Sequence, residues 1–256
     1  MKRALLIGIN YVRSPPNKLA GCANDVRNVA SFLGPNVETR TLSDDIEGAV
    51  WPSRKNITEA LAWLVCDLRA GDTVYVHYSG HGGLTVDVSG DEETGQDSCI
   101  YPISETGAVE CITDDELNRR LVSRVPRGAT CTVVFDCCHS ASCLDLRYGY
   151  RPISETELVV SENPRYPRGV GTVILLSGCM DAQTASEAWD AKTASPCGAL
   201  TEALLYALNE DRGPSGKKLK RVLWTVLARL RAEGHVQVPQ LSCSVPFPLS
   251  DQLFAV

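Results

Sequence analysis

Two segments of the sequence end in side chains that together could activate a thiol. His81 follows the apolar run 73–79, and Cys138 follows the apolar run 130–136. A thiol becomes a nucleophile when a nearby base takes its proton, so a histidine and a cysteine that reach one crevice can perform covalent catalysis. A single histidine or cysteine after a strand is more often structural. The occurrence of both favours a catalytic thiol.

A second thiol, Cys137, directly precedes Cys138. Side chains alternate along an extended segment, so Asp136 and Cys138 share one side and Cys137 points to the other. Ser79 and His81 share a side by the same rule. Asp136 and Ser79 are therefore expected beneath one crevice, where a carboxylate would bind a cationic group.

The segments that must position these side chains alternate between strands and helices. Strands are predicted at 4–9, 37–42, 73–79, 130–136 and 172–177. Helices are predicted at 24–33, from a cap at Asn56 to a stop at Gly71, from a cap at Thr113 with Glu116 at the capping-box position to Leu121, and in two segments after residue 177. Strands separated by helices favour a mostly parallel sheet covered on both faces, with ligands at the carboxyl ends of its strands.

The last part of the sequence adds one helix and one irregular segment to this pattern. The final helix carries leucine and valine at three- and four-residue steps from Leu219 to Leu230, with basic residues on its other sides. We interpret it as a core-packed helix with a solvated face rather than a membrane-binding helix. The segment 147–170 is rich in Arg, Pro, Glu and Ser. We expect a surface loop there, inside a single domain, between a part at 1–146 and a part at 171–256.

Composition limits the class of protein. The 256 residues are 44% hydrophobic and 22% charged, which excludes fibrous and disordered classes. With 25 basic and 31 acidic residues the formal charge is −6, which argues against nucleic acid as a partner. No apolar run reaches the ~18 residues that cross a bilayer, and the run 4–9 lacks the cleavage site of a signal peptide. We therefore expect a cytoplasmic protein with no membrane partner.

The cysteine content suggests an alternative class. The chain has 11 cysteines and only 4 histidines, and it contains no Cys-x-x-Cys pair. That absence disfavours a zinc-binding or oxidoreductase-type thiol protein. Without a secretory signal, most of these cysteines are expected to be reduced thiols in the core.

The two strand-end motifs resemble those of a known family. The segments 77–82 (HYSGHG) and 136–140 (DCCHS) are similar to the histidine and cysteine motifs of metacaspases, cysteine peptidases related to caspases. Further similar segments follow along nearly the whole chain, at 21–26, 90–102, 113–116, 144–146, 177–179 and 239–242. The resemblance implies a caspase-like, three-layer α/β/α fold. It selects Cys138 as nucleophile, His81 as base and the N–H groups of Gly82 and Cys138 as oxyanion donors, and it leaves His139 a structural or orienting role.

The resemblance also implies a substrate pocket for arginine or lysine at P1, the residue before the cleaved bond. Relatives line this pocket with residues that match Cys22, Asp25, Ser79 and Asp136. Two acids in one pocket would bind a protein or peptide substrate with a basic P1 residue and exclude an acidic one. Asp25 has a second interpretation, as an acid that complements the dipole of a helix N-terminus.

Activation by Ca²⁺ is a further implication of the resemblance. Calcium-activated relatives bind the ion through aspartates that match Asp97, Asp114, Asp115 and Asp145. Carboxylate oxygens suit Ca²⁺, although no EF-hand pattern is present. In the alternative interpretation, Asp114 and Asp115 only cap their helix.

Three more expectations follow from the comparison with metacaspases. The sequence begins close to its first strand, similar to the type-I arrangement without a prodomain, and the family implies a monomer. We expect self-cleavage after Lys192 first and Arg168 second. Ala141 stands where the family usually has glycine. If that position needs a positive φ, alanine would strain the loop, so the alternative is a catalytically weak or silent relative that binds peptides or partner proteins.

Overall fold

The structure is a computed structural model of the chain. It describes residues 1–90, 92, 94–138, 140, 142–154, 157–178, 187–190, 195–210, 218–246 and 253–255. Three of the residues discussed above, His139, Ala141 and Lys192, lie outside the described residues.

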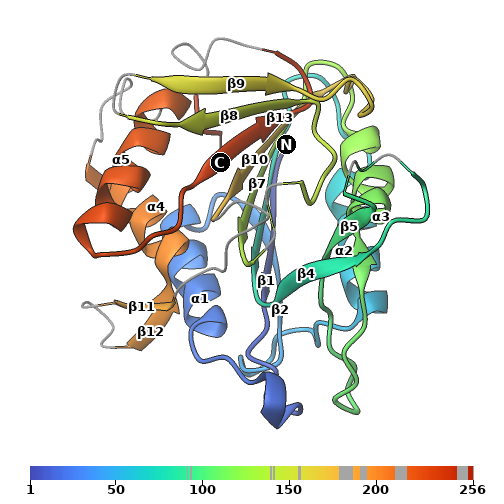
Figure 1. Cartoon of the computed structure of the whole chain (residues 1–256). Coiled ribbons are helices and arrows are strands. Elements are labelled where there is room, and N and C mark those ends of the chain that lie inside the picture. The colour runs from blue at the N-terminus through green and yellow to red at the C-terminus, as the bar shows by residue number, and fades with distance from the viewer. Residues whose placement is uncertain are drawn as a thin grey trace.

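An eight-stranded sheet runs through the centre of the molecule (Figure 1). Its strands, in spatial order, are β2 (Glu38–Ser43), β1 (Lys2–Gly8), β3 (Thr73–Ser79), β7 (Thr130–Asp136), β10 (Thr172–Ser177), β13 (Gln240–Cys243), β8 (Tyr148–Pro152) and β9 (Leu158–Glu162). The first five are parallel, and the last three pair antiparallel with their neighbours. The predicted, mostly parallel sheet is confirmed.

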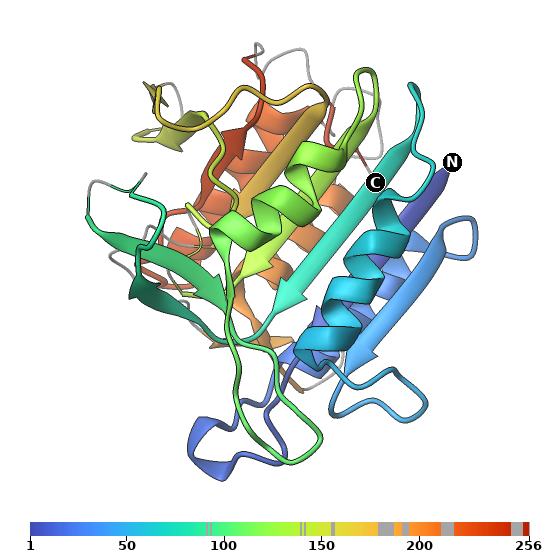
Figure 2. The same cartoon turned by 90° about the vertical axis from the view of Figure 1, so that its right-hand side faces the viewer.

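Helices cover both faces of this sheet (Figures 1 and 2). One face carries α1 (Cys22–Leu33), α4 (Ala199–Glu210) and α5 (Leu219–Ala232), and the other carries α2 (Arg54–Val65) and α3 (Asp114–Arg120). Short 3₁₀ helices lie at Pro15–Asn17 and Val122–Arg124. The three-layer α/β/α architecture is therefore confirmed.

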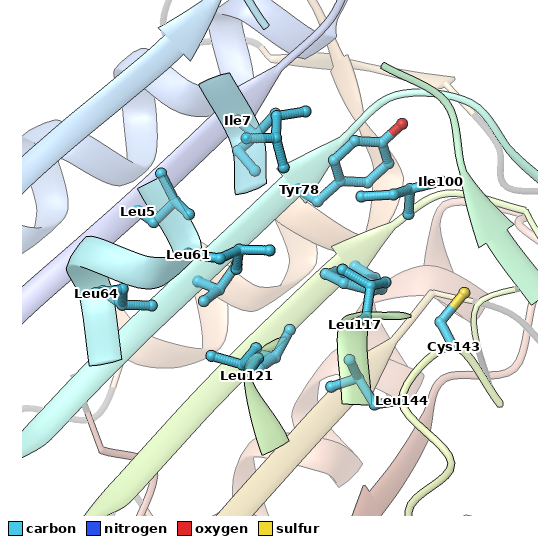
Figure 3. Close-up of a cluster of buried hydrophobic side chains, with 14 of the residues drawn as sticks. Leu5, Ile7, Leu61, Leu64, Tyr78, Ile100, Leu117, Leu121, Cys143 and Leu144 are labelled. Atoms are coloured by element: carbon cyan, nitrogen blue, oxygen red, sulfur yellow. The ribbon is translucent and has the colours of Figure 1, made fainter. Parts of the chain in front are cut away.

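Alternating side chains of the strands form two separate cores. In β1, Leu5 and Ile7 join the cluster beneath α2 and α3 (Figure 3), while Ala4 and Leu6 join the cluster beneath α1, α4 and α5. A continuous apolar run is what a strand buried on both faces requires. The leucines and valines of α5 from Leu219 to Leu230 are all buried, so the core-packed interpretation of this helix is confirmed. Among the described residues, no helix is both long and apolar enough to cross a membrane.

Two small strand groups lie beside the central sheet. β4 (Gly82–Val86), β5 (Gln96–Ile100) and β6 (Ile112–Thr113) form an antiparallel sheet that begins directly after β3. β11 (Glu187–Asp190) and β12 (Ser195–Gly198) form a hairpin before α4. Both groups lie next to residues of the candidate site.

Several predicted helix ends are wrong, because residues outside the predicted helices satisfy the end groups. Helix α2 is capped by Ser53, whose hydroxyl accepts from the Asn56 N–H at 3.2 Å, and not by Asn56. It ends at Val65 rather than near Gly71. The guanidinium of Arg3 donates to the carbonyls of residues 63 and 66 at that end, at 3.0 Å each.

Two further differences concern α1 and α3. Helix α1 begins at Cys22, two residues before its predicted start, because the Asn10 side chain accepts from the Cys22 N–H at 3.0 Å. Thr113 caps α3 as predicted. The Glu116 carboxylate forms ion pairs with Arg54 and Arg120 in place of the capping-box bond.

The prediction of a surface loop at 147–170 is wrong, because this segment contains two strands. Its strands β8 and β9 form a hairpin that extends the edge of the central sheet. Tyr148 and Tyr150 are buried in the cluster beneath α1, α4 and α5. Their two-residue spacing is the alternation of a strand, but the many charged and turn-forming residues of the segment hide it in the sequence. The Arg147 and Glu162 side chains pair at 2.7 Å across the base of the hairpin.

Candidate active site

The pairing of β3 with β7 determines where His81 and Cys138 lie. Ser79 and Asp136 are direct partners in this parallel pair. His81 and Cys138 each follow their partner residue by two positions, so both loops leave the same edge of the sheet at the same level. A Cβ on Gly82 would collide with the carbonyl oxygen of Cys138, so only glycine permits this close approach of the two loops.

The two adjacent thiols have different environments. Cys137 is 1% exposed and belongs to the core cluster beneath α2 and α3. Cys138 is partly exposed. The predicted alternation of the two side chains is confirmed, and only Cys138 is accessible to a substrate. In the described part of the chain, ten cysteines are in the thiol form, and seven of them are buried.

The imidazole of His81 is held by the loop that follows β1. Its Nε2 lies 2.8 Å from the carbonyl oxygen of Asn17. A carbonyl only accepts, so Nε2 carries the proton and Nδ1 is left as the basic nitrogen. The ring of Tyr11 packs on the imidazole with 4.7 Å between the ring centroids.

Two buried carboxylates lie on the α1 and α4 side of these strand ends. The Ser79 hydroxyl donates to Asp25 Oδ2 at 2.5 Å, and the Gly198 N–H donates to Asp25 Oδ1 at 2.8 Å. The backbone N–H and the hydroxyl of Thr201 donate to Asp136 Oδ2 at 2.9 and 2.7 Å. The structure thus brings together three of the predicted pocket residues, Asp25, Ser79 and Asp136.

The two carboxylates converge at Gly198. A Cβ on this glycine would collide with Asp136 Oδ2 and lie 2.9 Å from Asp25 Oδ2. Burial raises the pKa of Asp136, because the ionised carboxylate loses its hydration. A cation between these acids would relieve this penalty. Cys22, the fourth predicted pocket residue, is buried one helical turn before Asp25 on α1.

Carboxylates also gather beside the small sheet that follows β3. Side-chain oxygens of Glu92, Asp114 and Asp145 lie within 4.8 Å of one another, and so do those of Asp87, Glu92 and Asp97. Three of the four predicted calcium ligands therefore lie in two clusters that share Glu92. The fourth, Asp115, belongs to neither cluster and lines an adjacent open pocket together with Asp145.

The donor set of these clusters fits a hard divalent cation. Its members are carboxylates, the ligand type that Ca²⁺ prefers. Burial raises the pKa of Asp114 to about 7, and the charges of Asp97 and Asp115 add to this effect. A bound cation would offset that repulsion. A bond of 2.6 Å between the hydroxyls of Ser98 and Ser142 links β5 to the loop that follows Cys138.

The structure describes one of the two predicted self-cleavage positions, Arg168. Lys192 lies outside the described residues. Arg168 lies between β9 and β10, and its side chain is 70% exposed and 3.8 Å from the Glu162 carboxylate. Its exposure is compatible with access by a peptidase.

Comparisons with known proteins decide the family. The family model described as metacaspase, peptidase C14 domain matches residues 2–147. Metacaspase-1 of Scheffersomyces stipitis is 34% identical over 300 residues, which cover 98% of this chain and 72% of that protein. Metacaspase-1 of Ajellomyces capsulatus is 36% identical over 293 residues, which cover 96% of this chain and 80% of that protein. The chain belongs to the metacaspase family.

A solved structure adds to this result. A crystal structure of a Geobacter sulfurreducens protein is similar to this metacaspase with a TM-score of 0.69 and 22% identity, and the match covers 98% of this chain and 96% of the other. This similarity shows the fold. Membership of the family identifies the chain as a caspase-like cysteine peptidase, a hydrolase that acts on proteins or peptides.

Five residues of this metacaspase site were not identified from the sequence. Tyr11, Asn17, Gly198 and Thr201 contact the predicted residues from loops or elements far away in the chain, whereas Glu92 lies close in sequence to Asp97. Thr201 had a local signal, since it lies in the first turn of α4, where free N–H groups attract anions. For Glu92 the local signal was its place in the acidic segment 90–97. For Tyr11, Asn17 and Gly198 the sequence has no local signal.

Proposed function

We propose that this metacaspase hydrolyses peptide bonds after arginine or lysine, with Cys138 as nucleophile and His81 as its base. The observation that carries the proposal is the convergence of Asp25 and Asp136 at Gly198. These acids lie beside the edge of the sheet from which His81 and Cys138 extend.

The proposed chemistry follows from the His81 tautomer that the hydrogen bond to the Asn17 carbonyl stabilises. Its Nδ1 takes the proton from Cys138 Sγ, and the thiolate forms a bond to the carbonyl carbon of the substrate. The N–H groups of Gly82 and Cys138 are our proposed donors to the oxyanion. The imidazolium then protonates the leaving amine, and a thioester remains on Cys138. Water, deprotonated by His81, attacks the thioester, the carbon–sulfur bond breaks, the acid is released, and the imidazolium returns the proton to Cys138 Sγ.

Specificity is assigned to the two carboxylates. A guanidinium offers donors in a planar fork, and an ammonium offers a point charge, so both offset the buried negative charge. Thr201 and Gly198 fix the carboxylate oxygens through the hydrogen bonds given above. An aspartate at P1 would add a third carboxylate and is expected to be excluded.

Rates on matched peptides test this function. Peptides that differ only at P1 should be hydrolysed when P1 is Arg or Lys and not when it is Asp, because buried like charges repel strongly. The measurement is kcat/KM for each peptide, with Cys138→Ala as the blank. Equal rates on Arg and Asp peptides would contradict the proposed specificity. No hydrolysis of any peptide would favour a silent, peptide-binding relative.

We further propose that Ca²⁺ activates the enzyme through Asp97, Asp114, Asp115 and Asp145, with Glu92 as an additional ligand. When bound, the ion would supply positive charge that neutralises these carboxylates. Asp145 follows Cys138 by seven residues, and Asn118 of α3 donates to the Leu144 carbonyl at 2.8 Å. The acidic clusters and the loop after the nucleophile are thus connected, which supports an effect on the active site without a part in the reaction.

Calcium should stimulate both peptide hydrolysis and self-cleavage. We expect half-maximal stimulation at ~10⁻⁴–10⁻³ M, the range of weak oxygen sites. Mass spectrometry should show new ends after Lys192 or Arg168 that are absent in Cys138→Ala. The double variant Asp114→Ala/Asp115→Ala should lose the response, and Glu59→Gln, an exposed acid on α2, should keep it. Full activity in excess chelator would refute calcium activation.

A further inference from the structure

We propose that Tyr11 and Tyr78 are positioning residues for the base His81, each through its hydroxyl. This inference rests on the proposed roles of His81 and Cys138. The two tyrosines come from different elements, since Tyr11 lies in the loop after β1 and Tyr78 lies near the end of β3. Both are fully buried.

The two hydroxyls hold opposite sides of the His81 backbone. The His81 N–H donates to the Tyr11 hydroxyl at 3.0 Å, and the Tyr78 hydroxyl donates to the His81 carbonyl at 2.6 Å. Each peptide group that flanks the catalytic imidazole therefore has one tyrosine partner. Rotation of the His81 backbone would break at least one of these bonds.

The remaining hydrogen bonds of the two hydroxyls, to the Tyr101 backbone, determine which atom donates in each bond. The Tyr11 hydroxyl donates to the Tyr101 carbonyl at 2.8 Å, and the Tyr78 hydroxyl accepts from the Tyr101 N–H at 3.3 Å. Each hydroxyl has one proton, so both protons are already used. The 3.3 Å between the two hydroxyl oxygens is then a contact and not a further hydrogen bond. Burial raises the pKa of both phenols, so they keep these protons at neutral pH.

Tyr11 also holds a strained backbone conformation. Its φ is 55°, in the left-handed region that bulky residues avoid because it is strained. The Asp44 carboxylate accepts from the N–H groups of Asn10 and Val12 at 2.8 Å each and so holds both neighbours of Tyr11. This conformation places the Tyr11 ring on the imidazole and its hydroxyl on the His81 N–H. Strain that neighbouring bonds maintain at such a point indicates a positioning role.

Single removal of each hydroxyl tests the inference. Tyr11→Phe and Tyr78→Phe should each lower kcat on a P1 Arg peptide by roughly 10- to 100-fold, since small displacements of a catalytic group have effects of this size. KM should stay within about threefold, because neither hydroxyl contacts the carboxylates that bind P1. The matched control is Tyr75→Phe. Tyr75 is buried on β3, and no hydrogen bond of its hydroxyl is found among the described residues.

A second readout separates positioning from a purely structural role. Alkylation of Cys138 by iodoacetamide, followed by peptide mapping, reports how readily His81 deprotonates the thiol. Exposed Cys66 serves as the internal reference. At pH 6 the two variants should alkylate Cys138 more slowly than the wild type and Tyr75→Phe do. Unchanged kcat and unchanged alkylation in folded Tyr11→Phe and Tyr78→Phe would overturn the inference.

The outcomes of this test are distinct from those of the proposed function. If Cys138→Ala is inactive while both tyrosine variants behave as wild type, only the positioning role fails. If Cys138→Ala remains active, the proposed nucleophile fails. Should Tyr11→Phe not fold, Tyr78→Phe carries the test alone, because it leaves the strained backbone at Tyr11 untouched.

Discussion

Cys138→Ala should reduce hydrolysis of a P1 Arg peptide to background, a loss of roughly 10⁴-fold or more in kcat. The reason is that the thiol of Cys138 is the accessible one at the edge where His81 also lies. Alanine removes the sulfur that forms the thioester in the proposed mechanism. The measurement is kcat at saturating peptide with a matched protein concentration.

Cys137→Ala is the matched control for this experiment. Cys137 is buried in the core, so its replacement should leave kcat within a few-fold of the wild type. Loss of its sulfur from a packed core should lower the free energy of unfolding by about 1 kcal/mol. If Cys137→Ala were inactive and Cys138→Ala active, the assignment of the nucleophile would be wrong.

Asp136→Asn should remove most of the cleavage after arginine. Loss of one partner from a buried charge pair costs about 2–5 kcal/mol, which is roughly a 30- to 4,000-fold loss in kcat/KM. The amide oxygen of asparagine can still accept both bonds from Thr201, so the fold should persist. The control Asp67→Asn changes an exposed acid outside the pocket, at a positive φ that asparagine tolerates, and should retain full activity.

The same variant should be more stable than the wild type. Burial raises the pKa of Asp136 above its value in the unfolded chain, so its ionised form opposes folding at neutral pH. This penalty is present above the folded pKa and is relieved as the pH falls through it. Asp136→Asn should therefore raise Tm at pH 8 by roughly 2–4 °C for each kcal/mol relieved, and by less at pH 5. A lower Tm at pH 8 would contradict this account of the pocket.

Much of the fold could be predicted from the sequence, because local patterns determine it. Strands β3 and β7 begin and end at the residues predicted from their apolar runs. Their parallel pairing was expected because helices separate the strands in the sequence. The end of α2 could not be predicted, because the guanidinium that satisfies it belongs to Arg3, on β1. The edge strands β8 and β9 were missed, since charged and turn-forming residues hide the alternation of Tyr148 and Tyr150.

The features of the candidate site that depend on a single segment could be predicted from the sequence. Side-chain parity correctly separated Cys137 from Cys138, and it placed Asp136 beneath the same edge. The partners of these residues depend on contacts across the chain. Gly198 meets Asp25 only because α4 packs next to α1, and Asn17 meets His81 only because the loop after β1 folds over the end of β3.

One measurement tests the central claim most directly. A peptidyl acyloxymethyl ketone with arginine at P1 forms a bond only to a thiolate that a base has activated in a pocket that accepts arginine. Peptide mapping of the treated protein should find the label on Cys138, with none in His81→Ala and none from the same reagent with aspartate at P1. A label on Cys137, or equal labelling by the arginine and aspartate reagents, would contradict the account.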